Sequence, residues 1–167
     1  MDFLLRLEQT GLSSWIREST SLFAFPGILL VHTIGMALVV GISAGIDLRI
    51  LGIAPALPLG PMESFFPILW IGFWMNAVTG TLLLMADATT KLANPDFYVK
   101  MVLIALALVS QRMIRTRILR DPQVDKRPFS TNDKVMALAS LIFWFGAVTA
   151  GRLLAYVGPV SGLSAMN

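Results

Sequence analysis

The residues in this sequence that could do chemistry are a few polar side chains set within long apolar stretches. The single histidine, His32, lies in the first stretch, and Asn76, Lys100 and Arg152 lie in the three that follow. Polar and ionisable side chains are costly to keep in such surroundings, so they are the first place to look for function. A neutral imidazole can ligate haem iron or another metal, or it can carry a proton.

The neighbours of His32 bear on this choice. A helix turns by about 100° per residue, which places Gly35 and Met36 on the face of His32. Gly35 would let a flat porphyrin come close, and Met36 or a second chain could supply another iron ligand. The same face also suits a histidine that hydrogen-bonds to a neighbouring helix. Haem ligation, helix packing, and proton, metal or quinone chemistry all stay open at this point.

The other polar residues also have two interpretations. Lys100 and Arg152 could hold an acidic group such as a haem propionate, and Lys100 could bind a quinone oxygen. Both could instead extend to the membrane surface, Lys100 in an ion pair with Asp96 four residues earlier. Asn76 lies on a stripe of small and polar residues that either lines a pocket or joins helices. The aromatic residues Trp70 and Trp74 suit a cofactor slot or contact with lipid.

The apolar stretches predict the elements that position these side chains. A bilayer core is crossed by about 20 helical residues. Four stretches are long enough, at about residues 22–46, 65–86, 97–114 and 135–157. Backbone groups in lipid must be hydrogen-bonded within the segment, so each stretch is expected to be a helix. Residues 1–20 are amphipathic and predict a short helix at the membrane interface. The predicted fold is all-α, a four-transmembrane-helix bundle forming a single domain over residues 1–167.

Composition and charge support this fold. Of the 167 residues 56% are hydrophobic and 14% are charged, whereas soluble domains carry about 25% charged residues. The net charge of +3 does not indicate nucleic-acid binding, because the basic residues gather in the loop at 112–134. The positive-inside rule makes that loop cytoplasmic. Both termini then face outward from a bacterial inner membrane, and Asp47 at the inner end of the first helix is expected to pair with the basic loop.

This topology places His32, Asp87, Lys100 and Arg152 together in the outer half of the membrane, which predicts an outer-leaflet polar pocket. The chain has no cysteine and one histidine. These counts exclude disulfides, thiolate metal sites and a site with several histidines from one chain. There is no complete catalytic motif. The isolated chain is therefore expected not to be an enzyme, although the sequence leaves this unsettled.

Several motifs carry a resemblance. Trp15-x-Arg-Glu18, Phe25-Pro26, His32-Thr-Ile-Gly35 and Asp47-Leu-Arg49-Ile-Leu-Gly52 resemble an uncharacterised family of small bacterial four-helix membrane proteins, and the likeness extends to Phe97-Tyr-Val-Lys100. That family implies no function. More loosely, the chain is similar to copper-resistance-D-type membrane domains and HemJ-type protoporphyrinogen oxidases. These pair a histidine of the first helix with a lysine that opens a later one, and the latter are associated with haem.

Three hypotheses follow. The first is a membrane subunit associated with electron transfer that binds haem b or quinone. If a metal is bound, its ligand from this chain would be His32. Its cofactor-binding residues would be His32, Gly35, Met36, Asn76, Lys100 and Arg152. The second is a non-catalytic structural or assembly subunit of a larger membrane complex. The third is copper or other metal handling, suggested by nine scattered methionines.

The second hypothesis is suggested by the small size of the chain, its lack of a soluble domain, its many aromatic residues and a GxxxG pattern at Gly41 and Gly45. Small residues at this spacing let helices pack closely. Gly41 lies about 180° from His32 around the helix, so the packing face and the chemical face are opposite. Besides the lipid bilayer, the expected partners are therefore other membrane subunits or a second copy of the chain.

Overall fold

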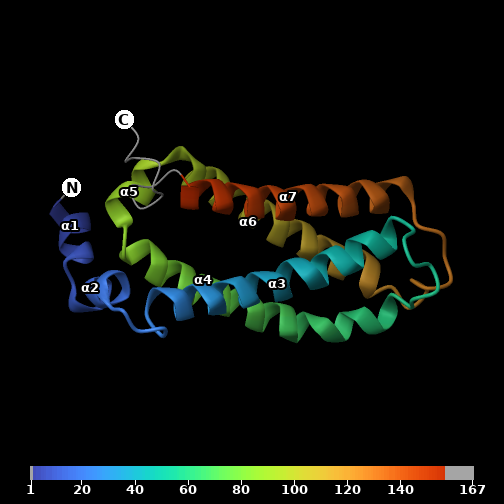
Figure 1. The fold of residues 1–167 in the computed structure, drawn as a ribbon. Coiled ribbons are helices and arrows are strands. Elements are labelled where there is room, and N and C mark those ends of the chain that lie inside the picture. Colours follow the sequence, from blue (N-terminus) through green and yellow to red (C-terminus); the bar gives the residue numbers. More distant parts are fainter. Residues whose placement is uncertain (1, 157–167) are drawn as a thin grey trace.

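The computed structural model describes residues 2–156, which form helices joined by short connections, without a strand in that range (Figure 1). The elements are α1 (Asp2–Glu8), α2 (Gly11–Glu18), α3 (Phe25–Ile50), the 3-10 helix η1 (Gly60–Phe65), α4 (Phe66–Met85), α5 (Ala88–Ala93), α6 (Pro95–Ile114), the π-helical turn η2 (Arg115–Leu119) and α7 (Thr131–Tyr156). The predicted all-α class is confirmed.

Four of these segments are long and apolar enough to cross a membrane: Phe25–Ile50, Gly60–Met85, Pro95–Leu119 and Thr131–Leu154. They match the four predicted spans with shifted ends. Proline in the first helical turn marks the starts of α3, α4 and α6, where its missing N–H has no partner to lose. The predicted end of the last span, Val157, lies outside the described residues.

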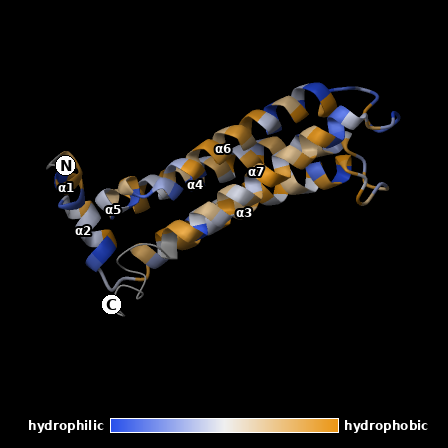
Figure 2. Cartoon of the chain, turned by 90° about the horizontal axis from the view of Figure 1, so that it is seen from above, coloured by the Kyte–Doolittle hydropathy of each residue, from blue (hydrophilic) through white to orange (hydrophobic). Residues whose placement is uncertain are grey.

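The long helices run up and down in two packed pairs, α3 with α4 and α6 with α7, and α3 also packs on α7. The short helices α1, α2 and α5 lie at one end of the bundle, here called the terminal end (Figure 1). The loops at 51–59 and 120–130 lie at the other end, here called the basic end. Hydrophobic residues follow the long helices, and hydrophilic ones gather at the loops of the basic end (Figure 2). This distribution fits helices whose outer faces contact lipid.

The buried core lies mainly toward the basic end. It includes Ile46, Ile50, Leu69, Ile114 and Ile118, each at most 2% exposed. The residues around His32, nearer the terminal end, are less completely buried. The two halves of the bundle therefore differ in packing, with a densely buried half toward the basic end and a more open half around His32.

Close contact between α3 and α4 depends on two glycines. A Cβ on Gly35 would lie 2.8 Å from the carbonyl oxygen of Gly72, and a Cβ on Gly72 would lie 2.7 Å from the Cβ of Leu38. Gly35 thus has a different role from the porphyrin access expected for it. By contrast, a Cβ on Gly41 or Gly45 would meet no described atom within 4 Å. The GxxxG pattern is therefore left facing outward.

The basic end is tied together by hydrogen bonds and ion pairs. The carboxylate of Asp125 accepts from the backbone N–H of Leu59 at 2.6 Å and of Gly60 at 3.0 Å. The loop at 120–130 therefore holds the start of η1 in place. One oxygen of Glu63 accepts from both Arg115 and Arg120, at 3.1 Å each. Part of the loop's positive charge is thus compensated within the chain.

At the terminal end, the predicted amphipathic segment forms two short helices instead of one. The carboxylate of Glu8 accepts from the backbone N–H of Thr89 at 2.6 Å and from its hydroxyl at 2.7 Å. Ser13 is fully buried, and its hydroxyl lies 3.2 Å from the carbonyl oxygen of Met85. Trp15 remains 44% exposed, as an interfacial anchor would be. The segment is docked on the turn between α4 and α5, a short helix that the sequence did not predict.

Candidate functional site

His32 is held by a side chain of α4. Its Nδ1 atom lies 3.0 Å from the hydroxyl oxygen of Thr79, and that hydroxyl donates its only hydrogen to the carbonyl oxygen of Met75 at 2.6 Å. Because the contact with Met75 is the shorter one, we assign the hydroxyl hydrogen to it; the Thr79 oxygen then accepts from His32, with the proton of the neutral ring on Nδ1. In the neutral ring, the lone pair then lies on Nε2. This is the atom that could accept a proton or ligate a metal.

Two further residues of α4, Asn76 and Gly80, contact His32. The side-chain amide of Asn76 donates to the backbone carbonyl oxygen of His32 at 2.9 Å. A Cβ on Gly80 would lie 3.2 Å from Cε1 of the imidazole, so the glycine makes room for the ring. Asn76 therefore joins α3 to α4 at the level of His32. The spacing of Asn76, Thr79 and Gly80 on one face could be read from the sequence, but their common partner could not.

Lys100 and Lys91 lie around this imidazole. The side chain of Lys100 runs along α7, where a Cβ on Gly151 would be 3.5 Å from both Cε and Nζ. Lys91, which the sequence did not single out as a site residue, donates from Nζ to the carbonyl oxygen of Leu83 at 2.6 Å. Burial lowers the pKa of Lys91, opposed by the charge of Asp87. Both lysines are near enough for their charges to act on His32.

The remaining predicted residues are placed as follows. Arg152 is exposed and forms no hydrogen bond or ion pair with another described residue. Within residues 2–156, the ion pairs do not include the expected one between Asp96 and Lys100. Met36 is partly buried on α3. The arrangement brings together His32, Asn76 and Lys100 of the predicted set.

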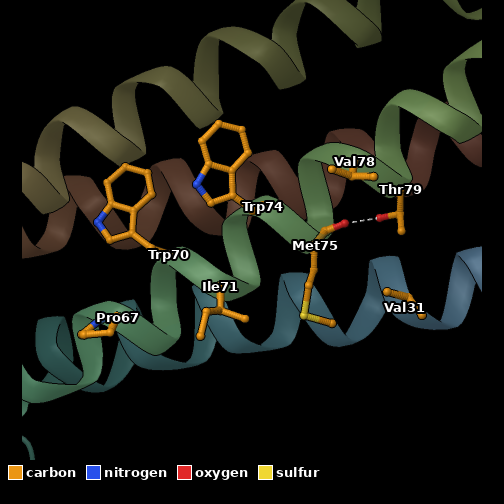
Figure 3. Close-up of a pocket in the computed structure, with 8 residues that line it drawn as sticks. All are labelled: Val31, Pro67, Trp70, Ile71, Trp74, Met75, Val78 and Thr79. Carbon is orange, nitrogen blue, oxygen red and sulfur yellow. Dashed lines mark hydrogen bonds between the residues drawn. The ribbon is translucent and has the colours of Figure 1, made fainter.

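An apolar groove of about 550 Å³ runs along α4 toward this site (Figure 3). Trp70 and Trp74 stand one turn apart on the same side of α4, and Thr79 closes the row (Figure 3). Thr79 thus lines the groove and also contacts His32 through its hydroxyl. The groove is lined by Val31, Pro67, Trp70, Ile71, Trp74, Met75, Val78 and Thr79.

No match was found to a protein-family model, a curated protein or a solved structure. Within the described part of the chain, no group of three or more His, Cys, Asp and Glu residues is placed to hold a metal ion. The fold and the four apolar helices define a multi-pass membrane protein built as a helical bundle. Its site is one imidazole oriented by a neighbouring helix, with two lysines near it.

Proposed function

We propose that this protein is a membrane subunit associated with electron transfer that binds a quinone in the terminal half of its bundle. The observation that carries the proposal is the hydrogen bond between His32 and Thr79, because it engages Nδ1 and leaves Nε2 without a hydrogen-bond partner within residues 2–156. A quinol hydroxyl can donate to such a nitrogen. His32 would then be the proton acceptor for the bound quinol.

Lys100 supports the same proposal. An ammonium group donates three hydrogen bonds, and Lys100 makes none to an acceptor within residues 2–156. Its side chain is partly buried near His32. A carbonyl oxygen of a quinone headgroup would give this ammonium an acceptor in a medium where an unpaired charge is costly.

The groove beside Thr79 suits the rest of such a ligand. Its lining is apolar and aromatic except for Thr79, which fits an isoprenoid tail. Ligand sites typically combine a largely apolar lining with a few placed polar groups. A headgroup at His32 and a tail along Trp74 and Trp70 would meet both conditions.

Haem b is the second candidate, and one observation favours it. A metal-ligating histidine nearly always donates its other ring N–H to a fixed acceptor, as Nδ1 does to Thr79. Against this, the Gly35 face is filled by α4, and the chain has only one histidine. Quinone binding needs neither an open face at Gly35 nor a second ligand.

A structural or assembly role is the alternative of another class. It is favoured by the outward-facing Gly41 and Gly45, which border a groove of about 210 Å³ with Met62 and Phe65. A second copy or another membrane subunit could pack there. Copper handling has less support, because His32 has no grouped metal ligands in the described chain.

We further propose that the protein lies in a bacterial inner membrane with the basic end in the cytoplasm. The loop at 120–130 and its flanks carry the densest positive charge of the sequence, which is the pattern of cytoplasmic loops. The site at His32 then lies in the outer leaflet, with both termini outside. Electrons from a bound quinol would pass to a redox partner in a larger complex.

The test is a binding experiment on the purified protein in detergent. Quinones quench tryptophan fluorescence, so titration with a soluble ubiquinone or menaquinone analogue reports occupancy near Trp70 and Trp74. We expect saturable quenching in the wild type, weakened about tenfold or more in Lys100→Met. The matched control is Arg152→Met, which removes an exposed cation and should bind as the wild type does.

A reduced-minus-oxidised absorption spectrum separates the alternatives. A stoichiometric haem band that disappears in His32→Ala would replace the quinone by haem b. A protein without pigment and without saturable quinone binding would favour the structural subunit. Extraction of the pigment-free protein with organic solvent then checks for a copurified quinone.

A further inference from the structure

A second polar cluster lies in the packed half of the bundle, where α3, α6 and α7 meet. Asp47 and Ser140 are fully buried and Gln111 is 2% exposed. The side-chain amide nitrogen of Gln111 donates to both oxygens of Asp47, at 3.3 and 3.2 Å, and to the hydroxyl of Ser140 at 2.9 Å. Asp47 is fifteen residues beyond His32 on α3, which is about 22 Å along a helix. The two sites are therefore separate.

Asp47 has no basic partner in the described chain. It takes part in none of the ion pairs there, contrary to the expected pairing with the basic loop. The charged residues nearest to it on the three helices are exposed or engaged elsewhere: Arg49, Arg112, Arg115, Asp133 and Lys134. Arg49 donates to the carbonyl oxygen of Leu57 and lies over the ring of Phe129.

The position of Asp47 also disfavours a negative charge. It lies in the last turn of α3, where the helix dipole presents its negative end. A carboxylate that is fully buried and unpaired is costly and tends to take up a proton. The neutral carboxylic acid avoids both costs.

Three buried polar atoms around the cluster have no hydrogen-bond partner within residues 2–156. They are the hydroxyl of Ser43, Oε1 of Gln111 and Nε1 of Trp144. Ser43 lies one turn before Asp47 on α3, and Trp144 lies one turn after Ser140 on α7. Buried groups of this kind are rare and indicate an unseen water or ion, or an alternative arrangement.

The amide of Gln111 can adopt a second orientation, which changes the atom at the unpartnered position rather than satisfying it. Turning the amide over exchanges Oε1 and Nε2. In the turned state, Oε1 accepts from a protonated Asp47 and from the hydroxyl of Ser140, while Nε2 takes the unpartnered position. The two orientations of the amide thus match the two protonation states of the carboxyl group.

We propose that Asp47 is a buried proton-binding site within the membrane, and that the amide of Gln111 reverses when the proton is taken up or released. The protonated carboxyl donates to Oε1 of Gln111, and the ionised one accepts from Nε2. The hydroxyl of Ser140 accepts from Nε2 of Gln111 when Asp47 is ionised, and it donates to Oε1 of Gln111 when Asp47 is protonated. Quinone or haem binding at His32 plays no part in this proposal.

The experiment is infrared spectroscopy of the whole protein in lipid nanodiscs across a pH series. We expect the C=O stretching band of a carboxylic acid at neutral pH, where exposed carboxyl groups are ionised. The band should disappear on raising the pH and be absent in Asp47→Asn, which mimics the neutral side chain. The matched control is Asp96→Asn, near the other end of the bundle, which should keep the band. Gln111→Leu should shift the band, because it removes the hydrogen-bond acceptor.

A second measurement does not depend on the variants. In wild-type protein carrying ¹³C-labelled aspartate, the band should move with the isotope. The proposal is overturned if the wild type shows no carboxylic acid band at neutral pH, or if Asp47→Asn retains it. Stabilisation by Na⁺ that is lost in Asp47→Asn, without a band in the wild type, would instead assign a bound metal cation.

Discussion

The hydroxyl oxygen of Thr79 accepts from Nδ1 of His32 at 3.0 Å while donating to the carbonyl oxygen of Met75 at 2.6 Å. This pair fixes the tautomer of the imidazole and the side from which a ligand can reach it. The contact joins two helices whose residues are 47 positions apart. It is the relationship on which the proposed site depends.

Thr79→Val keeps the shape of the side chain and removes its hydroxyl. We expect the quinone analogue to bind about tenfold more weakly, since the imidazole loses its orientation, while stability falls by about 1 kcal/mol. Fluorescence titration and thermal unfolding measure the two effects. Thr81→Val removes an exposed hydroxyl bonded only to Ala77 and should change neither. Equal affinity in both variants would count against the orienting role of Thr79.

Gly72→Ala tests the close contact between α3 and α4. The added methyl group would meet the Cβ of Leu38 at 2.7 Å, and overpacking of this kind costs about 1–3 kcal/mol. Thermal unfolding in detergent should show the loss. Gly45→Ala adds the same group where no described atom lies within 4 Å and should leave the midpoint unchanged. A comparable loss in both variants would mean that the outward face of α3 is also packed.

Glu8 makes the docking of α1 sensitive to acid. Burial alone would raise the pKa of Glu8. The hydrogen bonds from the side chain and backbone of Thr89 have the opposite effect and outweigh it, so the pKa lies below the usual 4.5. A lowered folded pKa means that the stabilisation is fully present above pH 4.5 and is lost as pH falls through the folded pKa. Limited proteolysis near residue 10 should therefore accelerate only below about pH 4.5.

Glu8→Gln is the control for that experiment. Its amide cannot ionise, so cleavage should be faster than in the wild type at neutral pH and should not depend on acidification. If the wild type and Glu8→Gln showed the same pH profile, the acid sensitivity would belong to another group.

Asp125→Ala removes the acceptor for the backbone N–H groups of Leu59 and Gly60. Loss of a capping carboxylate typically costs about 0.5–2 kcal/mol, and we expect a decrease of that size in the free energy of unfolding. Chemical or thermal denaturation measures it. Lys126→Ala changes the adjacent exposed residue and should have little effect. An unchanged Asp125→Ala variant would show that the loop at 120–130 does not support α4.

Single cysteines test the proposed orientation, because the natural chain has none. Ser130→Cys at the basic end should resist a membrane-impermeant thiol reagent in intact cells with a permeable outer membrane. Ser19→Cys at the terminal end should be labelled under the same conditions. Labelling of Ser130→Cys with protection of Ser19→Cys would reverse the topology and place His32 in the inner leaflet.

Much of the fold was predictable because it depends on composition along the chain. An uninterrupted apolar segment can satisfy its backbone in lipid only as a helix, so the spans follow from hydrophobicity and length. Short connections then require an antiparallel bundle. The ends were less predictable, since α5 and the division of the N-terminal segment depend on contacts such as that of Glu8 with Thr89.

The candidate site was predictable only in its residue types. His32, Asn76 and Lys100 could be picked out because polar groups in apolar helices are rare. Helical spacing could not reveal that Gly35 packs against Gly72, or that Arg152 lies at the surface. It also could not show that Asp47 meets Gln111 and Ser140 rather than the basic loop.

The sequence by itself determined that this is a multi-pass helical membrane protein, because the free energy of placing a segment in lipid is set by the residues of that segment. Only the tertiary structure decided which polar side chains meet. That outcome depends on how each helix is rotated about its axis, and the rotation is set by contacts between residues far apart in sequence, such as Gly35 with Gly72.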